Sequence, residues 1–169
     1  EFHKSVDGGM SFTAQTNGWP SPQQAGDHQR RVEIAVTPAD PNLVYANATG
    51  SANGGSGTYG IYKSSDAGTS WIFQCCGTQP AGPPSPTNIN MMGWDKDGQD
   101  DGGQYYYDVA LAVDPLNPQK LHLGGVNHWI SEDGGANWTC PAKWSEPHLD
   151  GYVHADIHDI RFLGTELWI

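Results

Sequence analysis

The chain has 169 residues, with 8 Lys and Arg against 19 Asp and Glu, which gives a formal net charge of −11 at pH 7. This balance excludes nucleic acid and anionic membrane surfaces as expected partners, because both require clustered cations. Gly and Pro are abundant, at 22 and 12 residues, yet aromatic residues still make up 11%. Many turns between short aromatic-rich segments predict an all-β protein rather than a disordered acidic tail.

One motif, S-x-D-x-G-x-[S/N]-[W/F], recurs three times along the chain. The shared positions are Ser5, Asp7, Gly9 and Phe12; Ser64, Asp66, Gly68 and Trp71; and Ser131, Asp133, Gly135 and Trp138. A short Asp side chain accepts hydrogen bonds from backbone N–H groups just downstream, and Gly supplies a positive φ. Each copy therefore predicts a hairpin turn with the aromatic ring packed over it. Carboxylate chemistry or metal binding at the three Asp residues is the less favoured interpretation.

A second element, with Asp-Pro or Asn-Pro pairs, recurs over residues 36–45 and 113–122. Proline cannot continue a strand ladder, so this element predicts a loop between two strands. Together the two elements predict four strands per unit. We expect them at 30–36, 43–48, 58–63 and 70–75 in one unit, and at 105–113, 119–124, 126–131 and 137–141 in the next.

Repeated four-stranded antiparallel units predict the blades of a β-propeller. We expect residues 1–25 to end one blade, 26–90 and 91–150 to form two complete blades, the latter with an acidic insertion loop, and 151–169 to begin another. Propellers close with roughly four to eight blades. We therefore expect a partial propeller, part of a longer chain that supplies the remaining blades as partners. The start at Glu1, without Met, agrees with that expectation.

On its three motif copies the chain resembles BNR or Asp-box repeat propellers of the sortilin-like and xyloglucanase-like kind. The stretch from Gly93 to the end resembles large secreted surface proteins of Bacteroidetes, many of which use type IX secretion. The resemblance implies a propeller fold and an extracellular or cell-surface location. It implies no single activity, because Asp boxes occur in sialidases, glucanases, sorting receptors and binding modules alike. A sialidase is disfavoured, since this sequence has only three Arg residues, two of them adjacent.

The densest group of ionisable residues lies near the C-terminus. His154, Asp156 and His158 alternate along a predicted innermost strand and would share one face. Innermost strands line a propeller's central channel, where ligands usually bind. The aligned repeats add further channel candidates from the two preceding blades: Tyr105, Tyr107 and Arg30. A polar network that ties blades together, a glycan or peptide site, and a metal or acid–base centre are the three interpretations of this group.

Two further features concern metals and redox state. Asp95, Asp97 and Asp100 resemble part of a calcium loop, which makes calcium the one cofactor that the sequence suggests, although a solvated acidic loop is favoured. Cys75 and Cys76 are adjacent and Cys140 is alone. Two disulfides are open: a bridge from Cys140 to one of the adjacent pair, or a vicinal bridge within the pair. Zinc is not expected, because the sequence lacks a second pair of closely spaced Cys ligands.

We expect a non-catalytic binding or scaffold module for a glycan or a protein. Four Trp residues in or near loops could stack on sugar rings: Trp19, Trp94, Trp129 and Trp144. The alternative is a xyloglucanase-like glycoside hydrolase, in which Asp108 and Asp156 on neighbouring innermost strands would be the catalytic candidates. A purely structural propeller is the third hypothesis. Hydrolysis requires two converging carboxylates, one with a raised pKa, whereas binding requires exposed aromatic rings.

Overall fold

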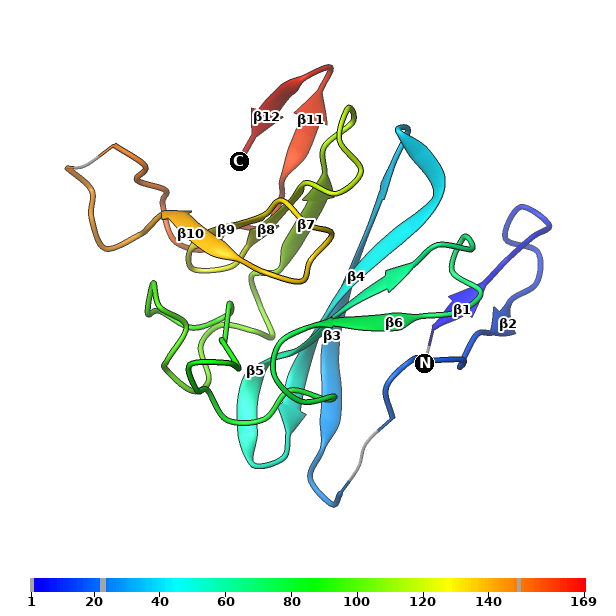
Figure 1. The fold of residues 1–169 in the computed structure, drawn as a ribbon, viewed down its shortest axis with the longest axis horizontal. Helices are drawn as coiled ribbons and strands as arrows, with labels where there is room; N and C mark the ends of the chain where they lie inside the picture. Colours follow the sequence, from blue (N-terminus) through cyan, green and yellow to red (C-terminus); the bar gives the residue numbers. More distant parts are fainter. Residues whose placement is uncertain (1, 22–23, 149) are drawn as a thin grey trace.

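The computed structural model describes residues 2–21, 24–148 and 150–169, and its elements are all strands. Two four-stranded antiparallel sheets lie between two short hairpins (Figure 1). The all-β prediction is confirmed. No helix among the described residues is long and apolar enough to cross a membrane.

Each sheet is built from strands that are consecutive in the chain. The first sheet has the order β3-β4-β5-β6, with β3 (His28–Thr37), β4 (Asp40–Ala52), β5 (Gly55–Ser64) and β6 (Ile72–Cys75). The second has the order β10-β9-β8-β7, with β7 (Ala110–Val113), β8 (Leu121–Gly124), β9 (His128–Ser131) and β10 (Thr139–Ala142). The hairpins are β1 (His3–Lys4) with β2 (Thr13–Ala14), and β11 (Arg161–Leu163) with β12 (Glu166–Trp168).

All eight strands predicted for the two complete units are present, with different bounds. The first proline loop is shorter than predicted, because β4 already begins at Asp40 and includes Pro41. Pairing of β4 with β5 starts only at Val44, opposite Ser64, so the missing N–H of Pro41 removes no bond from that ladder. The predicted strand 105–113 is wrong in its first half. There the backbone turns, with the N–H groups of Tyr107 and Asp108 donating to the Gln104 carbonyl.

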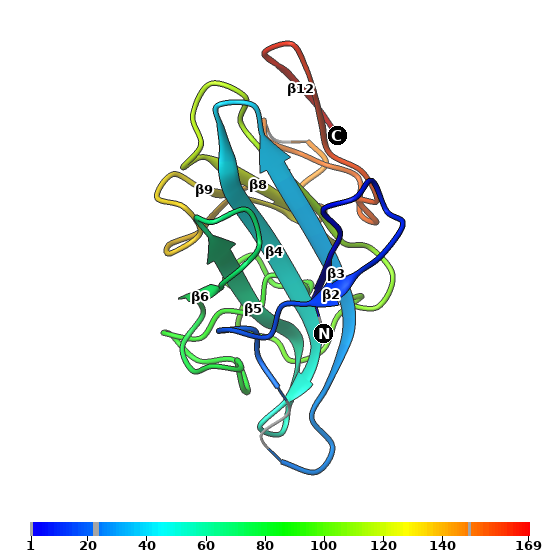
Figure 2. The same cartoon turned by 90° about the vertical axis from the view of Figure 1, so that its right-hand side faces the viewer.

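The sheets and hairpins stack in chain order, with an apolar layer in each interface. The layer between the two sheets includes Tyr45 and Ile61 from the first and Leu121 and Trp129 from the second. A second layer joins the β1–β2 side to the first sheet, and a third joins the second sheet to the segment leading into β11–β12. Figure 2 shows β3, β4 and β5 side by side within the first sheet.

The first strands of the two sheets run side by side in the same direction. Arg31 near the start of β3 donates hydrogen bonds to the carbonyls of Tyr107 and Val109, at the start of β7. Thr37 at the end of β3 donates to the carbonyl of Asp114, just beyond the end of β7 (2.9 Å). Parallel first strands in successive sheets are the arrangement of neighbouring propeller blades, in which every first strand faces the axis.

The three motif copies form the turns of β1–β2, β5–β6 and β9–β10, and the last two join the third strand of a sheet to its fourth. In the second copy the Ser70 N–H (2.8 Å) and the Ser70 hydroxyl (2.6 Å) donate to the two carboxylate oxygens of Asp66, and the Gly68 N–H donates to the Ser64 hydroxyl (2.8 Å). The equivalent bonds occur in the other two copies, with Asn137 in place of the last Ser in the third. These carboxylates are therefore used to close turns, and hydrogen bonding lowers their pKa values.

The aromatic residue that closes each motif copy is not packed equally. Trp71 and Trp138 are buried, and Trp138 donates its indole N–H to the Gly135 carbonyl of its own turn (2.9 Å). Phe12 is 62% exposed. The expectation of a ring packed over the turn is therefore wrong for Phe12. Trp71 is covered by Phe2 and Trp19 from the segment before its sheet, and the described residues give Phe12 no such cover.

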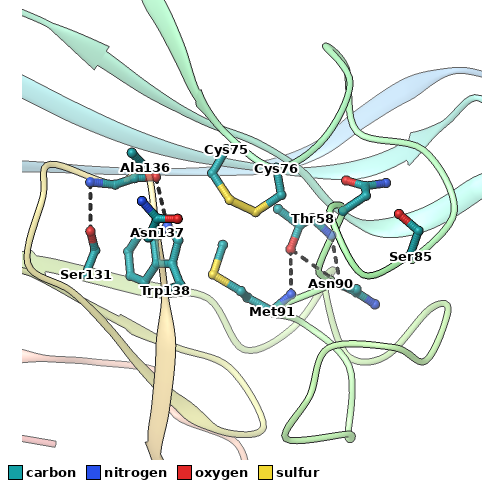
Figure 3. Close-up of a disulfide and its surroundings, with 12 residues drawn as sticks. Thr58, Cys75, Cys76, Ser85, Asn90, Met91, Ser131, Ala136, Asn137 and Trp138 are labelled. Carbon is teal, nitrogen blue, oxygen red and sulfur yellow. Dashed lines mark hydrogen bonds between the residues drawn. A yellow bond between two sulfur atoms is a disulfide. The ribbon is translucent and has the colours of Figure 1, made fainter.

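The cysteines form a vicinal bridge between Cys75 and Cys76 at the end of β6, and Cys140 is a free thiol. Both bridged residues are buried in the layer between the sheets, and Figure 3 shows Met91 and Trp138 beside them. Of the two pairings that the sequence left open, the structure has the vicinal one.

Candidate functional site

The predicted channel residues near the C-terminus do not form a strand. The first strand of that unit begins later, at Arg161, because Asp156 adopts a left-handed backbone conformation (φ 69°) that interrupts extended structure. The segment is nonetheless anchored, since the Ile157 N–H donates to the Gly125 carbonyl beyond β8 (3.0 Å). His154, Asp156 and His158 are all exposed. The strand that was to place them on one face is absent, and their shared face stays a prediction.

Two contacts join this segment to the turn before β7. The His158 ring meets the Tyr107 ring edge-on at 4.6 Å between centroids. The Gln104 amide donates to the Asp156 carboxylate (2.7 Å). Tyr105, in contrast, packs against the apolar layer between the sheets, and its carbonyl accepts a bond from Thr49 (2.6 Å). The Tyr105 side chain is partly buried there, and its place in the channel group stays a prediction.

Arg31 rather than Arg30 joins β3 to this site. Arg30 falls at an irregularity in the β3–β4 register, between the Gln29↔Gly50 and Arg31↔Thr49 pairs, and its side chain is exposed. Arg31 bonds the backbone on both sides of Asp108, through the carbonyls of Tyr107 and Val109. Arg31 thus makes the contacts between the two sheets, and a channel role for Arg30 stays a prediction.

Asp108 is the most perturbed acid of this site. It is 0% exposed, and neither carboxylate oxygen has a hydrogen-bond partner. Burial first, and the nearby charge of Asp156 second, raise the pKa of Asp108 from 3.8 to about 6, while His158 and Arg31 act in the opposite direction. Asp108 precedes β7 and Asp156 precedes β11, so the expected pair lies on the connections into two first strands rather than on the strands.

A hollow of about 660 Å³ opens beside the exposed members of this group. It is lined by residues 152–159 together with Leu167 and Ile169. Asp156 and His158 therefore face a concave surface from which Asp108 is excluded, since Asp108 is fully buried. This hollow, with Tyr107 at its side through His158, is the candidate ligand site (the channel site below).

The acidic loop does not form a calcium site. Asp100 accepts the N–H groups of Trp94 (2.7 Å) and Asp95 (3.1 Å), and Asp95 accepts that of Asp97 (3.3 Å), so the carboxylates stabilise their own loop. Within the described residues, no three or more His, Cys, Asp or Glu side chains are grouped so as to hold a metal ion. The calcium prediction at Asp95, Asp97 and Asp100 is corrected accordingly.

The four Trp residues singled out from the sequence divide into two pairs. Trp19 and Trp129 are buried and belong to the apolar layers. Trp94 and Trp144 are 46% and 39% exposed. Stacking on a ligand is thus open to the second pair alone.

Sequence reasoning missed a buried pair of imidazoles. His122 on β8 and His128 on β9 stack with their ring nitrogens 3.0 Å apart, and Phe162 meets His122 edge-on. Burial lowers the pKa of His128 to about 4, so the pair is neutral at pH 7. Cross-strand alternation of the two strands was the signal that could have placed them on one face.

The strand order, the parallel first strands and the repeated turn define the class of this protein: all-β, built of four-stranded antiparallel units like propeller blades. Among solved structures, the crystal structure of the GH74 xyloglucanase from Xanthomonas campestris is similar, with 25% identity and a TM-score of 0.45 over 80% of this chain. The match spans 16% of the xyloglucanase chain. No protein-family model matches the chain, and no curated protein sequence is similar to it.

Proposed function

We propose that the chain is a non-catalytic binding module, a segment of a secreted or cell-surface β-propeller that holds a glycan or protein ligand at the channel site. The observation that carries the proposal is the convergence of Tyr107, Asp156 and His158 from two connections beside a hollow of about 660 Å³. Ligand sites are typically concave surfaces with a few convergent polar groups. An exposed ring, a carboxylate and an imidazole supply that combination.

The burial of Asp108 favours binding over catalysis. A general acid must come within hydrogen-bond distance of the group that it protonates. Asp108 has the raised pKa that such an acid needs, but its 0% exposure keeps its carboxyl group from any ligand in the hollow. Asp156 reaches the hollow, and its backbone strain at φ 69° is of the kind that accumulates at functional positions.

The remaining blades of the same propeller are the second proposed partner. β3 exposes Ile34 (47%) and Val36 (65%), and these line an apolar hollow of about 530 Å³ that also involves β7 and the start of β11. Apolar side chains on first strands are what further blades would cover. The vicinal bridge supports a location outside the cell, since disulfides persist in oxidising compartments.

A ligand screen tests the proposal. The intact chain is applied to arrays of glycans and of peptides, and each hit is measured again with Tyr107→Ala and His158→Ala. We expect both variants to weaken binding by about tenfold, as for central interface residues. Phe12→Ala, which removes another exposed ring, is the matched control and should change nothing. Binding that survives both site variants, or a chain that binds neither class, refutes the proposal.

A glycoside hydrolase is the second candidate, favoured by the raised pKa of Asp108 beside the carboxylate of Asp156. Glycoside hydrolysis uses a carboxylic acid and a carboxylate that flank the bond to be cleaved. The test is release of reducing ends from a panel of β-glucans by the intact chain, by Asp108→Ala and by Asp156→Ala. Turnover that both variants abolish would establish the hydrolase. No turnover by the intact chain removes it.

A further inference from the structure

The two short hairpins on either side of the four-stranded sheets are complementary half-sheets (Figure 1). β11–β12 corresponds to the first two strands of a unit, since β11 begins directly after buried Ile160, as β7 begins directly after buried Val109. β1–β2 corresponds to the last two strands, since its turn carries the Asp motif that joins third to fourth strands in both full sheets. In those sheets the second strand pairs with the third. Among the described residues, β12 pairs only with β11 and β1 only with β2, so each lacks that one neighbour.

The first strand of the first sheet lacks a cover that the first strand of the second sheet has. Counted back from the proline that follows each strand, Ile34 is equivalent to Leu111 and Val36 to Val113. Leu111 and Val113 are 7% and 5% exposed, because they pack in the layer against the preceding sheet. Ile34 and Val36 are 47% and 65% exposed. An apolar surface of this kind on a sheet is typical of an interaction site.

The turn of the first motif copy lacks a neighbour in the same way. A Cβ on Gly68 would lie 3.0 Å from the Phe2 ring, and a Cβ on Gly135 would lie 2.9 Å from Ile61, so each of these turns packs on the unit before it. No described atom lies within 4 Å of the same position on Gly9. The side of β1–β2 that corresponds to these two contacts is therefore open.

The β11–β12 hairpin is open on the side that faces away from the second sheet. Phe162 and Leu167 pack in the apolar layer against that sheet. Their neighbours Leu163 and Trp168 point to the opposite face, because side chains alternate along a strand, and they are 60% and 58% exposed. A free strand edge beside an exposed apolar face favours pairing with another strand.

We propose that a second copy of this chain supplies the missing neighbours, and that the two copies close head to tail into one ring. β12 of each copy pairs with β1 of the other, so that two half-sheets form one four-stranded sheet at each junction. Two full sheets and two half-sheets amount to three units, so two copies provide six. Propellers close with roughly four to eight blades, which excludes the three units of one copy and the nine of three copies. This inference rests on the proposed function, because it names the source of the remaining blades.

The register of the second sheet predicts favourable side-chain pairs at each junction. The equivalent positions, matched by their pairing with the first strand and by their distance from the motif Asp, are Glu166 and His122, Trp168 and Gly124, Lys4 and Ile130, and Phe2 and His128. In the β8–β9 ladder, His122 lies opposite Ile130 and Gly124 lies opposite His128. We therefore expect Glu166 opposite Lys4 of the other copy, and Trp168 opposite Phe2. Opposite charges and aromatic rings in such cross-strand positions stabilise a sheet.

The test is the mass of the intact chain in solution, measured by light scattering and by sedimentation equilibrium over a range of concentrations. We expect a dimer of about twice 18.2 kDa. Glu166→Lys and Lys4→Glu should each weaken the dimer about tenfold, because each places like charges opposite one another at both junctions. The double variant should restore the dimer, since it only exchanges the two charges. Glu132→Lys is the matched control, because it makes the same charge change at the surface ion pair with Lys120, outside the junction.

Each outcome supports or overturns the second copy as the source of the missing blades. A chain that stays monomeric, or that forms assemblies larger than two copies, overturns the inference. A dimer that neither single variant weakens, or that the double variant does not restore, overturns it as well, because its interface is then a different one. Circular dichroism of each variant establishes that it is folded.

Ligand binding, measured on the same samples, separates this inference from the ligand site of the proposed function. A monomer that binds a glycan or peptide through Tyr107 and His158 overturns the inference and leaves the channel site standing. A dimer with the expected response to the charge variants that binds neither ligand class supports the inference and refutes the channel site alone.

Discussion

Replacement of Asp108 by Asn tests the electrostatics of the channel site. Asp108 is fully buried with no hydrogen-bond partner for either oxygen, so burial disfavours its charged form, and the charges of His158 and Arg31 offset this only in part. Asn has almost the same shape and no charge. Any fixed cost of the new amide is the same at every pH, whereas the cost of the carboxylate is not.

The magnitude follows from the pKa of Asp108, which rises from 3.8 in the unfolded chain to about 6 in the native protein. The native state then binds the Asp108 proton more tightly than the unfolded state does. The protonated Asp108 therefore stabilises the native state fully below pH 3.8, and this stabilisation is lost as the pH rises through 6. At about 1.4 kcal/mol per pKa unit, the charge costs about 3 kcal/mol at pH 7.5 and about 1 kcal/mol at pH 4.5. The free energy of unfolding of Asp108→Asn, relative to that of the natural chain, should therefore rise by about 2 kcal/mol from pH 4.5 to pH 7.5.

The assay is urea unfolding followed by Trp fluorescence at both pH values, with the variant compared with the natural chain so that all other titrating groups cancel. Asp159→Asn is the control, because Asp159 pairs with Arg161 at the surface. Asp156→Asn should lower the pKa of Asp108 and recover part of the gain. A free-energy difference between Asp108→Asn and the natural chain that does not change with pH would refute the reasoning.

Three further predictions concern other parts of the chain. Burial lowers the pKa of His128 from 6.5 to about 4. Between pH 6.5 and pH 4 the unfolded chain therefore binds more protons than the native chain, and the free energy of unfolding falls by up to about 3 kcal/mol as the pH falls. His128→Gln should remove this pH dependence, as measured by urea unfolding. Gly18 and Gly8 have φ of 75° and 74°, but a Cβ at Gly18 would overlap the Trp71 carbonyl, whereas Gly8 faces open space. Gly18→Ala should therefore lower the free energy of unfolding by about 2 kcal/mol more than Gly8→Ala, and equal losses would contradict the overlap. Burial raises the pKa of the Cys140 thiol to about 11, so iodoacetamide at pH 8 should label it at least about a hundredfold more slowly in the native than in the urea-unfolded chain, as read by mass spectrometry.

The fold was predictable because its signals are local. Each Asp motif contains its own turn chemistry, since the Asp66 carboxylate accepts bonds from residues three and four positions downstream. The position of that turn then fixes where the third strand ends and the fourth begins. Strand bounds were less predictable, as at Pro41, because the register of neighbouring strands decides whether a missing N–H matters.

The candidate site was predictable only in part. The segment of His154, Asp156 and His158 lacks the strand that alternation predicted, although the repeat alignment correctly brought Tyr107 to His158. The alignment did not indicate that Tyr105 is partly buried against the apolar layer between the sheets. The hydrogen bond from the Trp144 indole to the Trp94 carbonyl had no signal in the sequence, because it depends on the buried Asn127 amide, which holds the two loops together.

The amino-acid sequence by itself determined the repeating unit, because turn residues and apolar alternation act over a few neighbouring positions. It also settled the sign of the net charge, which is negative. The folded chain determined that Arg31 bonds β3 to the segment before β7, and that the cysteine bridge is the vicinal one rather than a bridge to Cys140. Those choices depend on one-residue shifts at bulges and on contacts between distant loops, which no local pattern encodes.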